Sequence, residues 1–234
     1  PSFRSALYSD LAGRDKQIDE GQTLTEDSLS PEEKRWRFVT NWSMPPEDTK
    51  EFFVAGVHGD TSCPMTLAIG KARKVDVKPY EGRMGRPLMP NGEEAPSGNY
   101  RQHSLYLGWM TCIFALLGVV SMFFKGDSDE KKFFDKRITI AFFLTAAVVF
   151  WIFSMGRYVE GVYRCVFALP FGDYLRAPVK WHHLTEFCIV VLAAFGLGFA
   201  WSLVSRYGVY ARTALIAIVV YGACDLAGEA KKYC

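Results

Sequence analysis

The sequence predicts an all-α integral membrane protein: a bundle of four transmembrane helices that follows an extended, largely irregular extramembrane arm. Two observations support this prediction. Half of the 234 residues are hydrophobic, yet 22% are charged, and this mixture fits neither an average soluble protein nor a simple membrane bundle. The two kinds of residue are segregated, because residues 1–102 are polar whereas residues 103–234 contain nearly all of the long apolar runs.

The arm contains one clear helix start. Ser30 is suited to cap a helix, Pro31 fits its first position, and Glu33 completes a capping box. These residues predict a short helix near residues 31–42. Further along, the proline- and glycine-rich stretch 79–98 predicts an extended segment.

The arm has too few periodic apolar runs to build a core of its own. We therefore expect a large neighbouring surface to hold it in place, which would make the protein a built-in part of a bigger assembly. The side chains expected to make those contacts are aromatic: Trp36, Trp42, Phe52 and Phe53.

Four apolar stretches predict membrane spans near residues 104–124, 138–156, 184–205 and 210–229. The first three are uncharged over enough residues to cross a hydrocarbon layer of about 30 Å. The fourth is weaker, because only a short apolar run separates Arg212 from Asp225. A full span requires Arg212 to extend to the interface, and a short re-entrant hairpin is the alternative.

The second span is expected to continue as a helix to about residue 168. Arg157, Glu160 and Arg164 recur on one helical face, and Pro170 should end the helix. Four spans place both termini and the 157–183 loop on one side, where Arg157, Arg164, Lys180 and Trp181 suit the lipid headgroup layer. Lysines and arginines are divided evenly between the two sides, so they give no orientation.

Two of the four histidines stand together in the stretch VKWHHLTEF, residues 179–187. With four spans, His103, His182 and His183 lie on the same side of the membrane. A haem b between helices, as in the membrane anchors of succinate dehydrogenase, needs two inward-facing histidines, and a quinone pocket needs a few donors. Adjacent helical residues point about 100° apart, so only one of the pair can easily face His103. The alternative is that these histidines only anchor the helix at the interface.

Two acids, Glu186 and Asp225, lie within the predicted spans, each near an end, where snorkelling or an ion pair accounts for them. Small residues recur at helix-packing spacing in three pairs. These pairs, which predict close helix approach, are Ala194 with Gly198, Gly196 with Ala200, and Ala223 with Ala227.

The expected function is non-catalytic. The net charge is only +2 and the basic residues are scattered, which excludes a nucleic-acid surface. The anatomy resembles the accessory subunits of large mitochondrial inner-membrane complexes, and the resemblance implies other subunits and phospholipid as partners and no cofactor. The alternatives are a haem b- or quinone-binding anchor and an ER membrane component, the latter suggested by Lys231 and Lys232 near the C-terminus.

Overall fold

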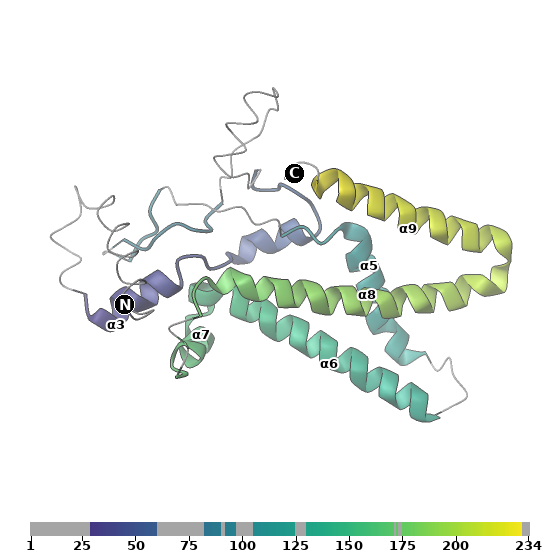
Figure 1. Cartoon of the computed structure of the whole chain (residues 1–234), viewed down its shortest axis with the longest axis horizontal. Coiled ribbons are helices and arrows are strands. Elements are labelled where there is room, and N and C mark those ends of the chain that lie inside the picture. The colour runs from purple at the N-terminus through teal and green to yellow at the C-terminus, as the bar shows by residue number, and fades with distance from the viewer. Residues whose placement is uncertain are drawn as a thin grey trace, which may run out of the picture.

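The protein is an all-α membrane protein, and its computed structural model describes residues 29–59, 82–89, 92–96, 105–124, 130–170, 172 and 175–230. Within these ranges the extended chain forms only one isolated antiparallel bridge, between Leu88 and Glu94. The α-helices, labelled in Figure 1, are α3 (Pro31–Val39), α5 (Trp109–Val120), α6 (Glu130–Ser154), α7 (Glu160–Phe167), α8 (His182–Val204) and α9 (Val209–Ala230). Short 3₁₀ helices include η1 (Pro46–Phe52), η2 (Ser121–Phe123), η3 (Gly156–Val159) and η5 (Pro178–Trp181).

Three of the described helical segments are long and apolar enough to cross a membrane: Phe134–Ser154, Pro178–Tyr207 and Val209–Glu229. The last of these is α9, the weakest span in the sequence. It is a continuous helix of 22 residues, about 33 Å at 1.5 Å per residue, so it contains no re-entrant turn. Arg212 near its start donates to the carbonyl of Ser205.

The prediction of a long helix over 104–124 is wrong for its first part. The helix begins only at Trp109, and α5 with η2 makes a shorter apolar segment, Trp109–Phe123. Before it the chain is extended, because Gly108 has a φ of 81° and the Leu107 amide donates to the carbonyl of Phe52. The arm therefore contacts the residues before Trp109, which the sequence had predicted to be the start of the helix.

The prediction that the second helix continues to about residue 168 is also wrong. The helix ends at Ser154, and α7 starts separately at Glu160. Gly156 between them has a φ of 47°, which lies in the left-handed region that favours glycine. A side chain there would also collide with Ser43 and Pro178. The chain bends here because the arm packs closely against the backbone.

The bundle is held together where α5 crosses α8 (Figure 1). A Cβ atom on Gly196 would overlap the carbonyl oxygen of Phe114, and one on Gly118 would overlap that of Leu192. The two backbones can approach so closely only because both positions lack a side chain. By contrast, Gly198 faces open space, and Ala223 and Ala227 are exposed.

The described arm buries its apolar side chains against the rest of the same chain, and the two clusters that it joins are shared with the bundle. Trp36 and Val39 pack with Tyr163 of α7, and Phe52 packs in a second cluster with Leu107. Of the four aromatic residues expected to contact a neighbouring protein, Trp36 and Phe52 are buried within this chain and only Phe53 is largely exposed. The burial of Trp36 and Phe52, among the described residues of the arm, therefore comes from this chain itself.

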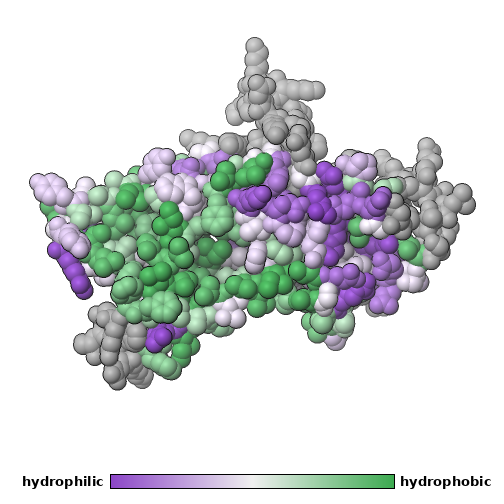
Figure 2. Space-filling view, turned by 180° about the vertical axis from the view of Figure 1, so that it is seen from behind, coloured by the Kyte–Doolittle hydropathy of each residue, from purple (hydrophilic) through white to green (hydrophobic). Residues whose placement is uncertain are grey.

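The surface divides along the length of the molecule. On the face of the molecule drawn in Figure 2, apolar side chains cover the helices, and hydrophilic side chains gather at the end where the arm lies. The exposed apolar side chains include Leu116, Phe142, Phe187 and Val220. Such a broad exposed apolar surface is what a lipid bilayer covers.

Candidate functional site

The described arm docks at one end of the bundle, where α6 ends and where α5 and α8 begin. Its 3₁₀ helix η1 lies over these helix ends. Phe52 accepts a hydrogen bond from the Leu107 amide at 3.2 Å, and Thr49 accepts one from the indole nitrogen of Trp151 at 3.3 Å. The ring of Phe52 packs on the ring of His182, with 4.6 Å between centroids. Three helices are therefore joined by a segment far from them in sequence.

A tight turn in the arm carries the most connected polar group, Glu94. The Met89 amide donates to the Glu93 carbonyl, and the Ala95 amide donates to the carbonyl of Pro87. Arg37 of α3 donates to the Met89 carbonyl at 2.7 Å. These bonds fix the turn between α3 and η3 and direct the Glu94 carboxylate toward the bundle.

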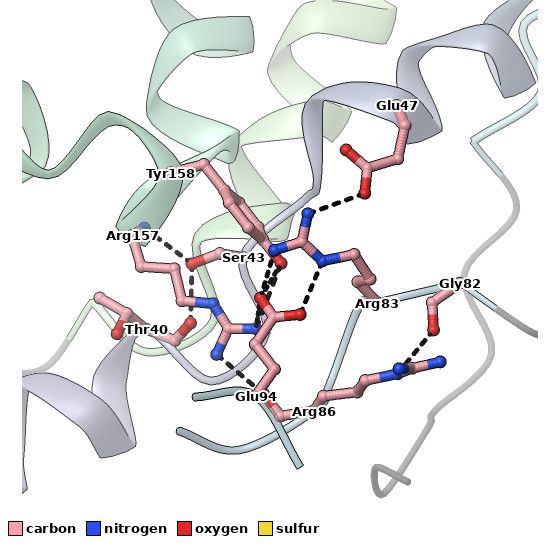
Figure 3. Close-up of polar contacts among 9 residues, drawn as sticks. All are labelled: Thr40, Ser43, Glu47, Gly82, Arg83, Arg86, Glu94, Arg157 and Tyr158. Carbon is pink, nitrogen blue, oxygen red and sulfur yellow. Dashed lines mark hydrogen bonds and ion pairs between the residues drawn. The ribbon is translucent and has the colours of Figure 1, made fainter. Parts of the chain in front are cut away.

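Glu94 lies at the centre of a network that we call the arm clasp: Arg83, Glu94, Arg157 and Tyr158 (Figure 3). Arg83 donates two hydrogen bonds to the carboxylate, at 2.6 and 2.9 Å. Arg157 and the Tyr158 hydroxyl donate to its Oε1 at 3.0 and 2.8 Å. Such bidentate, charge-assisted bonds are among the stronger ones in proteins.

Arg157 also binds backbone groups of the arm. Its guanidinium donates to the Arg86 carbonyl at 2.8 Å, and its amide donates to Ser43 Oγ at 3.0 Å. Ser43 Oγ in turn donates to the carbonyl of Thr40. The Arg157 side chain is only 6% exposed, so it is not the lipid-facing side chain that the sequence predicted. The bend at Gly156 turns it toward the arm.

The pKa shifts in the clasp keep it charged at neutral pH. Burial tends to raise the pKa of the Glu94 carboxyl, but hydrogen bonds from Arg83 and Tyr158 and the nearby cations outweigh burial, so this pKa lies below its ordinary value. The hydrogen bond to Glu94 raises the pKa of Arg83. Burial raises the pKa of Tyr158 to about 12, which keeps this hydroxyl a neutral donor.

The two adjacent histidines point in different directions from the start of α8. His182 is buried, with Nε2 3.3 Å from Oε1 of Glu186, although neither ring nitrogen has a hydrogen bond of good geometry among the described residues. His183 is exposed, and its Nδ1 lies 3.1 Å from Oε2 of Glu186. A ligand at His182 Nε2 would have to displace the Glu186 carboxylate. His103 lies outside the described residues, so its pairing with either histidine stays a prediction.

The basic residues predicted at the interface differ in their surroundings. The Arg164 guanidinium lies 4.5 Å from the ring centroid of Trp36 and pairs with Glu160 at 2.7 Å. Trp181 stacks on Phe150, with 5.7 Å between ring centroids. Lys180 beside it is exposed. Arg164 and Trp181 therefore contribute to packing within the chain, and Lys180 faces the surroundings.

Asp225 connects the last helix to the chain before α5. The Tyr106 hydroxyl donates to its carboxylate at 2.5 Å. This bond places the C-terminal end of α9 on the same side of the bundle as the arm. It also gives Asp225 a partner within the protein.

Sequence reasoning missed Arg83, Glu94 and Tyr158, as well as two buried acids of η1, Asp48 and Glu51. Nothing in the sequence around Glu94 sets it apart from the other charges of the arm. For Asp48 and Glu51 there was a signal, since acids three residues apart before Phe52 and Phe53 share one side of a 3₁₀ helix. Among the residues that the structure describes, no three His, Cys, Asp or Glu side chains are grouped so that they would hold a metal ion.

Comparison with known proteins gives no relative. No family model, no curated protein and no solved structure matches this chain.

Proposed function

We propose that the protein is a non-catalytic structural subunit of a large complex of the mitochondrial inner membrane, in the respiratory chain or the ATP synthase. In this role the helices form a four-span bundle that packs against lipid and the helices of other subunits. The extramembrane arm fixes one end of the bundle. The observation that carries the proposal is the uncovered face of α9.

Helix α9 is long enough to cross a membrane, but only one narrow stripe of its surface contacts the rest of the chain. Leu215 and Gly222 are its buried residues among those described, and Gly222 packs on Met110 of α5. The opposite face is exposed and consists mostly of small residues at alternating spacings of four and three: Thr213, Ala217, Val220, Cys224 and Ala227. This spacing forms a seam along a helix, and small residues in it allow a second membrane helix to approach closely.

The clasp supports a structural role in a different way. It connects Glu94 of the arm to Arg157 after α6 and so fixes the extramembrane chain to the bundle. A rigid surface at one membrane face suits attachment to other subunits. The mitochondrial location comes from the resemblance in anatomy: a few spans preceded by a long arm.

Site-specific photo-crosslinking tests this proposal. A photoreactive residue at Ala217, on the outward face of α9, is expected to capture one defined membrane subunit in the native membrane. The matched control is Leu215 on the inward face, where capture should stay within the chain. Crosslinks from Ala217 to lipid alone would contradict the proposal. Cell fractionation tests the location, and recovery with ER membranes would favour the alternative based on Lys231 and Lys232, which lie outside the described residues.

A haem b- or quinone-binding anchor is the second candidate. One observation favours it: His182 is buried, and its ring nitrogens have no hydrogen bond of good geometry among the described residues. The absorbance spectrum of the reduced, purified protein tests the haem version. A b-type spectrum that disappears in His182→Ala would establish it, and a featureless visible spectrum would exclude it.

A further inference from the structure

The 3₁₀ helix η1 contains two buried carboxyl groups that the clasp does not use. Asp48 is 0% exposed and Glu51 is 3% exposed. They are three residues apart, and side chains at that spacing lie above one another on a 3₁₀ helix. Of the Glu51 carboxyl, Oε1 is buried and has no hydrogen-bond partner among the described residues.

The described charged groups near this pair belong to η1, to the chain after it and to α8. His58 lies beside Asp48, with 3.6 Å from its Nε2 to Oδ1, and the ring of His182 packs on Phe52, with Glu186 behind it. On η1 itself, Glu47 is paired with Arg83 at 3.1 Å, and Lys50 is exposed. No arginine or lysine among the described residues forms an ion pair with Glu51 that would neutralise it. Two buried carboxylates whose charges act on each other, as Asp48 acts on Glu51, cannot both ionise cheaply.

We propose that Asp48 and Glu51 form a proton-binding site that holds one proton, on Glu51, while η1 is seated on the ends of α5, α6 and α8. When η1 leaves these helices, Glu51 becomes solvated and releases the proton to water. The attachment of the arm is therefore linked to pH. The proton removes the buried negative charge of Glu51.

The electrostatics of the site agree with this geometry. Burial, followed by the charge of Asp48, raises the pKa of Glu51 from 4.5 to about 7, and a hydrogen bond from the His58 backbone opposes this rise only in part. The seated state therefore binds more protons than the released state between these two values. Seating is strongest at or below pH 4.5, weakens as pH rises toward about 7, and is constant above that. Each unit of pKa difference is tenfold in the equilibrium, so the full change is on the order of 100-fold.

Hydrogen exchange of the full-length protein in lipid nanodiscs tests the proposal. The reporter is the Leu107 amide, which donates to the Phe52 carbonyl and is exposed when η1 leaves. After correction for the intrinsic exchange rate, its protection should fall on the order of 100-fold between pH 4.5 and 7. Protection that does not change with pH in this interval would overturn the proposal.

Three variants make the test specific. Glu51→Gln keeps the shape and stays neutral, so the fall in protection should disappear. Glu47→Gln, on the same 3₁₀ helix, should retain it. Asp48→Asn removes the neighbouring negative charge and should move the fall to lower pH. A Glu51→Gln protein whose protection still depends on pH as in the wild type would also overturn the proposal.

Discussion

Glu94 and Glu51 both belong to the arm, but their surroundings shift their pKa values in opposite directions. Glu94 is held by Arg83, Arg157 and Tyr158, and its pKa is lowered. Glu51 is buried beside another acid, and its pKa is raised to about 7. Burial acts on both in the same sense, so the presence or absence of a cation decides the direction.

Replacing Glu94 by Gln should weaken the attachment of the arm to the bundle. The change leaves Arg157, only 6% exposed, without its counter-charge, and losing such a partner costs about 1–3 kcal/mol. Limited proteolysis of the arm in detergent solution measures this, with an expected increase in cleavage rate of about tenfold or more. Glu32→Gln is the matched control, since Glu32 is an exposed acid of the same arm. Equal cleavage rates in the two variants would contradict the assignment of the clasp.

Acid should release the clasp. Because the pKa of Glu94 in the folded state lies below its ordinary value of 4.5, its contribution to stability is complete above pH 4.5 and is lost as pH falls toward the folded-state value. Proteolysis at residues 82–96 should therefore rise below pH 4.5 with an acid-active protease. In Glu94→Gln this rise should be absent, and a rise that persists there would show that another group is responsible.

Between the elements, the close crossing of α5 and α8 depends on two glycines. Gly118 and Gly196 each meet a backbone carbonyl of the other helix, so a side chain at either position cannot be accommodated by rotation. Gly198, two residues further along α8, has no such restriction, because no atom lies near the place that an added Cβ would occupy.

The substitutions Gly196→Ala and Gly198→Ala should therefore have opposite effects. The first overpacks the crossing and should lower stability by about 1–3 kcal/mol. The second improves helix propensity and should be neutral or raise stability by up to about 1 kcal/mol. Thermal unfolding of the two proteins in the same detergent measures both. A Gly196→Ala protein as stable as the wild type would contradict the crossing.

The sequence predicted the helices more accurately than the contacts between them. Ser30 accepts a hydrogen bond from the Glu33 amide at 3.2 Å, as expected of a helix cap, because capping is local. The bend at Gly156 was not predictable, because Ser43 and Pro178, which lie against this glycine, are distant from it in sequence. Glu94 and Arg157 are 63 residues apart in sequence, and no periodicity relates them.

Over the whole molecule, the described arm, η3 and the C-terminal end of α9 gather at one end of the bundle. Phe52 contacts Leu107 there, and Tyr106 contacts Asp225. The other ends of α5, α8 and α9 carry no arm contacts among the described residues. The described contacts outside the long helices are therefore concentrated at one end of the bundle, which we propose is the extramembrane face.

This arrangement predicts membrane sidedness. Cys165 of α7 is exposed and should react with a membrane-impermeant thiol reagent only from the side of the arm. A cysteine introduced by Ser128→Cys, between the first and second spans, should react only from the opposite side. Reaction of both from the same side would show that α6, which separates them in the chain, does not cross the membrane, and would contradict the four-span bundle.

The most direct test of the account is the size of the particle that contains the protein in its own membrane. Native electrophoresis after extraction with a mild detergent, followed by detection of a tag on the protein, measures this size. We expect a discrete band far above the mass of one chain in its micelle, which shifts or disappears when Ala217 and Val220 of α9 are replaced by Trp. A wild-type protein that migrates as a single chain would contradict its role as a subunit.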